Sequence, residues 1–121
     1  MEKKHSLIKS FGFAFEGLWA EIKKGRNFRI QIAAGFIAAT LGIILKLSPE
    51  EWLDLVIVIT IVLILELVNT SIEALVDLIS PEIQPKAKLA KDVSAATVLI
   101  ASIGAAIIGA LIFLPKLMAF I

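Results

Sequence analysis

Three long apolar stretches constrain this chain more than any other feature of its sequence. Residues 30–45, 53–65 and 93–114 hold very few polar side chains. A helix that crosses the hydrocarbon core of a membrane needs about 20 apolar residues, because it rises about 1.5 Å per residue. With flanking residues included, three spans fit, at about 28–46, 51–79 and 91–114. A mean hydropathy of +0.93 agrees with an integral membrane protein.

The segment before the first apolar stretch predicts an amphipathic helix in the membrane surface, at about residues 5–24. Its apolar side chains recur at helical spacing opposite charged ones: Leu7, Phe11, Phe15, Leu18 and Ile22 face away from Lys9, Glu16 and Lys23. This pattern does not separate a simple anchor from a helix that grips a substrate. The predicted fold is an all-α membrane protein with one domain over residues 1–121, in which the surface helix precedes three transmembrane helices.

The positions of lysine and arginine predict the orientation of the spans. Ten of the twelve lie before the first span or between the second and third, and only Lys46 and Lys116 lie on the other side. Positive residues near span ends are retained in the cytoplasm. We therefore expect a cytoplasmic N-terminus and an external C-terminus. The chain has no cysteine, which excludes disulfides and thiolate chemistry.

One face of the second predicted span carries acidic side chains. At about 100° per residue, Glu66, Asn69, Glu73 and Asp77 fall within an arc of about 80°. An ionisable residue at the centre of a spanning helix costs roughly 2.5 to 3.5 kcal/mol, so such residues line something polar. Helix packing alone would explain Asn69 and Asp77. It explains the two glutamates poorly, because neither of the other spans has an interior lysine or arginine.

The spacing of the two glutamates favours separate roles. Seven residues correspond to about 10 Å along a helix axis, which is too far for both carboxylates to hold one ion. Glu73 lies nearer to water and is suited to hold Mg²⁺ with phosphate oxygens, because this ion keeps few protein ligands. Glu66 lies deeper and is suited to accept a proton from a hydroxyl group at the membrane boundary.

A lysine and an aspartate follow the loop between the second and third spans. This loop, at about residues 80–88, is polar and contains two prolines, so we expect it to fold over a soluble ligand. By themselves, Lys91 and Asp92 indicate a helix end with a positive-inside signal. Beside the acidic face they indicate a phosphate site, where lysine binds phosphate and Asp92 caps the helix or helps to hold the metal.

Two motifs resemble the signature of the prokaryotic diacylglycerol kinase and undecaprenol kinase family. They are Glu66-x-x-Asn69-Thr-x-Ile72-Glu73-x-x-x-Asp77 and Ala90-Lys91-Asp92-x-x-Ala95-Ala96-x-Val98-Leu99. Gly17-Leu18 and Asn27-Phe28-Arg29 also stand where that family has comparable residues, so the resemblance spans nearly the whole chain. The family uses no P-loop, and this sequence contains no G-x-x-x-x-G-K-[ST].

The resemblance implies a kinase of the bacterial inner membrane that depends on ATP and Mg²⁺. It would phosphorylate a lipid hydroxyl, that of diacylglycerol or undecaprenol, by direct phosphoryl transfer at the cytoplasmic face. The stretch 26–29 favours undecaprenol. The resemblance also implies a homotrimer whose active sites are shared between subunits. We expect no nucleic-acid partner.

Roles for individual residues follow from the same resemblance. Glu66 would be the general base, Glu73 would bind the metal ion, and Asn69 would orient the acceptor. The other implied contacts are with the substrate, through Asn27 and Arg29, and with the nucleotide, through Lys91, Asp92 and Glu82.

The chain departs from the family pattern at one position. Family members usually have a metal-binding glutamate two residues before the position of Asn27, where this chain has Gly25. Glu21 lies one helical turn earlier and would reach the same region if the helix continues. The metal site could therefore be weakened, lost, or completed by Glu21.

Two other classes of function are compatible with the residues alone. In a small proton-coupled exporter, Glu66 would alternate between a protonated and a substrate-bound state. Such a protein needs no nucleotide loop, so Lys91 and Asp92 disfavour it. A structural or adaptor subunit is the third class, and it would keep its function after a Glu66→Gln substitution.

Overall fold

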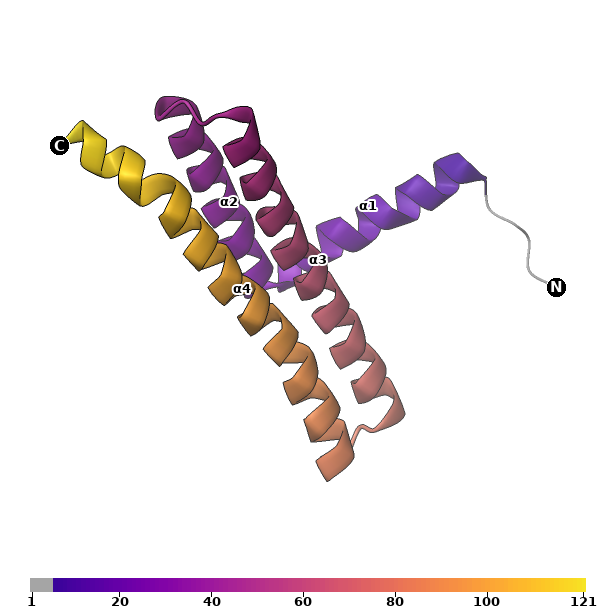
Figure 1. Cartoon of the computed structure of the whole chain (residues 1–121). Helices are drawn as coiled ribbons and strands as arrows, with labels where there is room; N and C mark the ends of the chain where they lie inside the picture. Colours follow the sequence, from indigo (N-terminus) through magenta and orange to yellow (C-terminus); the bar gives the residue numbers. More distant parts are fainter. Residues whose placement is uncertain (1–5) are drawn as a thin grey trace.

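A computed structural model describes residues 6–121, which form four helices (Figure 1). They are α1 (Leu7–Lys24), α2 (Arg26–Ile44), α3 (Pro49–Ile79) and α4 (Pro85–Phe120). The described residues contain no strand, and α2, α3 and α4 are each long and apolar enough to cross a membrane. The prediction of an all-α protein with a surface helix and three spans is confirmed. Residue 5, the expected start of the surface helix, lies outside the described residues.

The helices run past the expected membrane crossings at several ends. The largest difference is at α4, which begins at Pro85 although the third crossing was expected to begin near residue 91. Proline suits the first turn of a helix, because a backbone N–H has no partner within the helix there and its absence costs no hydrogen bond. Half of the expected loop is therefore helical, and the turn between α3 and α4 is short.

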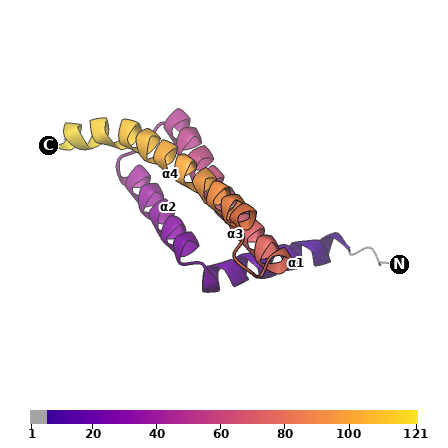
Figure 2. The same ribbon diagram turned by 90° about the horizontal axis from the view of Figure 1, so that it is seen from below.

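The four helices differ in direction. In both views α2, α3 and α4 run beside one another, while α1 crosses the end of α2 and points away from them (Figures 1 and 2). Contacts between α3 and α4 are the most extensive in the fold. Figure 1 also shows that α3 and α4 continue past the level of α1 to the turn that joins them. One end of this hairpin therefore projects beyond the surface helix.

The turn between α2 and α3 has the helix start that its sequence predicts. The Ser48 side chain accepts from the Glu51 amide, the Glu51 carboxylate accepts from the Ser48 amide, and Pro49 is the first helical residue. This reciprocal capping satisfies two amides that the helix leaves free. Gly42 lies close by, with the ring of Trp52 against its backbone. The absence of a side chain at Gly42 allows α2 and α3 to meet here.

Most large apolar side chains point outward. The buried cluster is small and consists of Leu47, Leu55 and Ile112, with Trp52 and Phe113 among the side chains packed against it. Within the most apolar window of each span, between 11% and 17% of the residues are buried. Because lipid is as apolar as these side chains, such a surface is stable in a membrane without a large internal core.

Candidate active site

The acidic face of α3 grades from buried to exposed along the helix. Glu66 is 5% exposed and Asn69 is 7% exposed, whereas Glu73 is half-buried and Asp77 is exposed. The sequence predicted that these four residues share one face, and each lies one turn from the next. The face connects the interior of the bundle with the open end of the α3–α4 hairpin.

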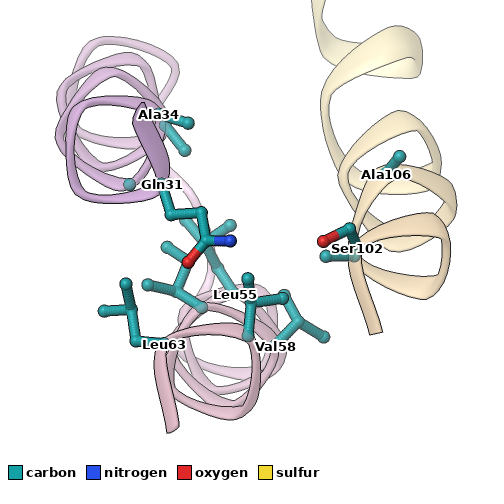
Figure 3. Close-up of a pocket in the computed structure, with 12 residues that line it drawn as sticks. Gln31, Ala34, Leu55, Val58, Leu63, Ser102 and Ala106 are labelled. Carbon is teal, nitrogen blue, oxygen red and sulfur yellow. The ribbon is translucent and has the colours of Figure 1, made fainter. Parts of the chain in front are cut away.

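Glu66 is held by a side chain that the sequence analysis did not single out. Gln31 on α2 donates from Nε2 to Glu66 Oε1 at 3.1 Å. Its side chain reaches into a cavity of about 280 Å³ between α2, α3 and α4, which apolar residues line (Figure 3). Gln31 is an isolated amide at the start of the apolar stretch 30–45, and this was the feature from which the sequence could have predicted its role. The partner of the buried carboxylate is therefore neutral.

The next turn of α3 pairs an amide with a carboxylate. Asn69 Nδ2 donates to Glu73 Oε1 at 2.9 Å, while Asn69 Oδ1 is buried and has no hydrogen-bond partner in the described part of the chain. Ser94 Oγ on α4 is also buried without a partner there. A buried polar atom left unpaired costs free energy, so these atoms indicate a missing ligand, water or neighbouring chain.

A cleft at the end of the hairpin collects the residues expected to bind the nucleotide. Lys91 Nζ lies 2.8 Å from Asp77 Oδ1 and ties α4 to α3, and Lys88 pairs with Asp92 one turn along α4. The cleft has a volume of about 310 Å³ and is lined by Asp77, Ser80, Glu82, Lys88, Lys91 and Asp92, among others. The cleft contains two lysines and three carboxylates, and both lysines are in ion pairs, so an anionic ligand would bind here by replacing a carboxylate as the partner of a lysine.

One expectation for this cleft is wrong. Asp92 does not cap α4, because the helix begins at Pro85 and the side chain of Asp92 is already paired with Lys88. Lys91 is likewise nearly two turns inside α4, too far to share an anion with the free amides of the first turn. Any binding of phosphate here therefore relies on the lysine side chains.

The structure separates Asn27 and Arg29 from the cleft around Lys91. Both are exposed near the junction of α1 and α2. Arg29 Nη1 donates to the carbonyl oxygens of Ile22 and Lys23, at 2.8 and 2.9 Å. A cation at the C-terminal end of a helix satisfies carbonyls that the helix leaves free. Arg29 thus fixes the angle at which α1 leaves the bundle.

The residues present suit a magnesium ion better than a metal with many protein ligands. No three acidic, histidine or cysteine side chains converge on one point within residues 6–121. Mg²⁺ requires only one or two carboxylates, together with water and phosphate oxygens. The Glu73 carboxylate, with the unpaired Asn69 Oδ1 one turn away, offers oxygen ligands of the kind that this ion prefers.

Spanning helices with an acidic face that opens into a lysine-lined cleft define a membrane protein with a polar site at one boundary. The model of the prokaryotic diacylglycerol kinase family matches residues 12–113. The chain belongs to this family. The resemblance seen in the two sequence motifs is therefore confirmed.

Relatives with assigned names agree with this membership. The undecaprenol kinase of Bacillus subtilis is 42% identical over 91% of this chain and 89% of its own length. A diacylglycerol kinase of Synechocystis is 37% identical over 93% of this chain and 65% of its own length. The diacylglycerol kinase of Escherichia coli K12 is 34% identical over 84% of this chain and 83% of its own length. The chain is a lipid kinase of the inner membrane, and the comparisons give no support to an exporter.

Proposed function

We propose that the chain transfers the terminal phosphate of ATP, with Mg²⁺, to the hydroxyl group of undecaprenol or diacylglycerol at the cytoplasmic boundary. The observation that carries this proposal is the continuous polar face of α3, which leads from the buried Glu66 to the cleft that contains Lys91. A lipid hydroxyl and a soluble nucleotide can approach this face from opposite ends. The relatives named for each lipid support both acceptors.

The position of α1 supports this assignment of the two ends. An amphipathic helix lies in the plane of the interface, and α1 contacts α3 at Thr70. From Thr70, α3 continues to Ile79, which is about 13 Å at 1.5 Å per residue. Glu66 is then at the lipid boundary, and Lys91 is in water. The lysine and arginine distribution assigns this water to the cytoplasm.

In the proposed reaction, Glu66 acts as the general base. Its carboxylate accepts the proton of the lipid hydroxyl, and the lipid oxygen forms a bond to the γ-phosphorus. The bond between this phosphorus and the β–γ bridging oxygen breaks, and ADP leaves with the electron pair. Asn69 orients the acceptor one turn away. Direct transfer without a phosphoenzyme follows, because Glu66 faces the hydroxyl rather than the phosphate.

The nucleotide binds in the cleft at the end of the hairpin. Lys91 exchanges Asp77 for the phosphates, and Glu82 and Asp92 contact the rest of the nucleotide or its water shell. Glu73 holds Mg²⁺, which would neutralise charge on the phosphates when bound. Most of the catalytic effect then comes from positioning and charge.

A homotrimer is the assembly that we propose. Support comes from Gln31 Oε1, Asn69 Oδ1 and Ser94 Oγ, which are buried within a single chain and yet have no partner in its described part. A neighbouring subunit, a bound substrate or water can satisfy them. The outward apolar faces of the spans provide the surface for contacts between subunits. Asn27 stays a predicted substrate contact.

The test is transfer of labelled γ-phosphate from ATP to each lipid in mixed micelles with Mg²⁺. The wild-type protein is expected to label at least one lipid, and the better acceptor identifies the substrate. Glu66→Gln keeps a partner for Gln31 but cannot accept a proton, so the rate is expected to fall about 10²- to 10⁴-fold. The control is Glu16→Gln on the exposed side of α1. Full activity in Glu66→Gln would show that Glu66 is not the general base. The absence of any labelled lipid with folded wild-type protein would contradict the proposed reaction.

A further inference from the structure

A buried carboxylate lies where the surface helix meets the bundle. Among the described residues of α1, only Glu21 is buried, with 9% of its surface exposed. Its Oε1 accepts a hydrogen bond from Thr70 Oγ1 on α3 at 3.2 Å. An amphipathic helix normally buries its apolar side chains and leaves charges in water. The burial of an ionised carboxylate such as Glu21 is costly unless a cation pairs with it.

Gly25 provides the space that the Glu21 carboxylate occupies. A Cβ atom at position 25 would lie 3.0 Å from Glu21 Cδ and closer still to Glu21 Oε1. The φ of −87° is open to any residue, but a Cβ atom here would also lie 2.9 Å from the Glu21 backbone oxygen, so a side chain at position 25 requires a small backbone shift as well. The missing side chain therefore makes room, and a carboxylate from position 21 lies where a side chain at position 25 would begin.

The Glu21 carboxylate meets α3 at Thr70, beside the acidic face. Its partner Thr70 is one turn from Glu66 on one side and from Glu73 on the other, at i+4 and i+3 spacing, which brings Cβ atoms to about 5–6 Å. Glu21 also lines an open cleft of about 600 Å³ between α1 and α3, in which Lys24 is the other charged residue and Thr70 and Ser71 are the polar residues of α3. On the acidic face itself, the Asn69 residue is 93% buried and its Oδ1 has no partner among the described residues, which indicates a missing ligand beside Glu73.

We propose that Glu21 is the second carboxylate of the Mg²⁺–nucleotide site, together with Glu73. It takes the place of the metal-binding glutamate that the family resemblance implies at the position of Gly25. In this chain the helical turn between positions 21 and 25 delivers the same group from a different residue. The inference rests on the proposed function, because Glu73 is the metal residue only within that proposal.

The test measures metal binding directly and moves the carboxylate between the two positions. Mn²⁺ binding to the purified protein in micelles, with a non-hydrolysable ATP analogue, is followed by electron paramagnetic resonance. The variants are Glu21→Gln, Gly25→Glu and the double variant Glu21→Ala/Gly25→Glu, in which alanine vacates the space that the Glu21 side chain occupies. The control is Glu16→Gln, an exposed glutamate on the same helix. Thermal unfolding of each protein checks that it is folded.

Glu21→Gln is expected to weaken Mn²⁺ binding by at least about tenfold, and Glu16→Gln is expected to leave it unchanged. Gly25→Glu alone is expected to weaken it too, because two side chains compete for one space. The double variant is expected to recover most of the affinity. Equal affinity in the wild type and Glu21→Gln would overturn the proposal, and so would a loss that the double variant does not repair.

Lipid phosphorylation by the same proteins separates this inference from the proposed function. If the wild-type protein binds Mn²⁺ through Glu21 but labels neither lipid, the metal site is supported and the proposed reaction is contradicted. If the wild-type protein labels a lipid and Glu21→Gln binds Mn²⁺ as tightly as the wild type, the reaction is supported and the role of Glu21 is contradicted.

Discussion

At the scale of single residues, the site depends on buried polar groups with few partners. Glu66 accepts from the neutral amide of Gln31, and no lysine or arginine pairs with it in the described chain. The neutral donor orients the carboxylate and leaves no opposite charge beside it, so a substrate hydroxyl has no cation to displace.

Replacing Gln31 by leucine is expected to reduce the rate of lipid phosphorylation about ten- to a hundredfold. A hydrogen bond to a charged group contributes about 1.5–3 kcal/mol, which corresponds to this range of rates. The control is Thr40→Val on the same helix, where the hydroxyl bonds only to the Phe36 carbonyl. Kinetics at saturating ATP are the measurement. Equal rates for the two variants would show that Gln31 does not position Glu66.

Replacing Lys91 by glutamine is expected to raise the KM for ATP. The substitution removes a charge from the cleft, while the exposed pair with Asp77 contributes little to folding, so the thermal unfolding midpoint is expected to stay the same. Lys86→Gln is the matched control, because Lys86 is near the start of α4 but does not line the cleft. An unchanged KM in Lys91→Gln would contradict the assignment of the nucleotide site.

At the scale of elements, two long helices combine different tasks. α3 has 31 residues and α4 has 36, which correspond to about 46 and 54 Å, whereas the hydrocarbon core is about 30 Å thick. α2 has 19 residues and is only long enough to cross. The excess length of α3 and α4 forms the hairpin end with the cleft. In the proposed arrangement, the length of these helices extends the site from lipid into water.

Gly42→Ala is expected to destabilise the junction of α2 and α3. Its Cβ would lie 2.8 Å from the Trp52 ring and 2.9 Å from Leu47 Cδ1, so these side chains must move. Overpacking of this kind costs about 1–3 kcal/mol. The matched control is Gly104→Ala, because a Cβ there meets nothing within 4 Å. Thermal unfolding in detergent is expected to give a lower midpoint for Gly42→Ala only, and equal midpoints would contradict the close approach.

At the scale of the whole molecule, the proposed arrangement has α1 in the plane of the membrane and the α3–α4 hairpin on the side of the nucleotide. α1 crosses the end of the bundle (Figure 2). Its Phe11, Phe15 and Trp19 side chains are exposed, and an interface would cover them. Arg29 and the Glu21–Thr70 contact hold α1 at this angle. The depth of Glu66 relative to the interface is therefore a property of the assembled chain.

Reporter fusions test the proposed orientation. Alkaline phosphatase needs its disulfides and is active only outside the cytoplasm. A fusion after Ile121 is expected to be active, and a fusion within the turn at 80–84 is expected to be inactive, because ten of the twelve basic residues lie on the side of that turn. An inactive fusion after Ile121 and an active fusion in the turn would contradict the proposed orientation, because the ATP cleft would then lie outside the cell.

The sequence predicted the features that depend on local pattern. Hydropathy indicated three spans, the amphipathic period indicated the surface helix, and the shared face of Glu66, Asn69 and Glu73 followed from 3.6 residues per turn. The two motifs were enough to indicate the family. All these properties are carried by residues within a few turns of one another, so they are visible without knowledge of the fold.

Only the tertiary structure decided which side chains meet between helices. The contacts of Gln31 with Glu66, Thr70 with Glu21, and Lys91 with Asp77 join residues that are far apart in the chain. They depend on the crossing angles and the register of the helices, which hydropathy does not encode. The start of α4 at Pro85 likewise set Asp92 beyond the first turn and against Lys88. The residue types at the site were determined by the sequence alone, while their partners were determined by how the helices pack.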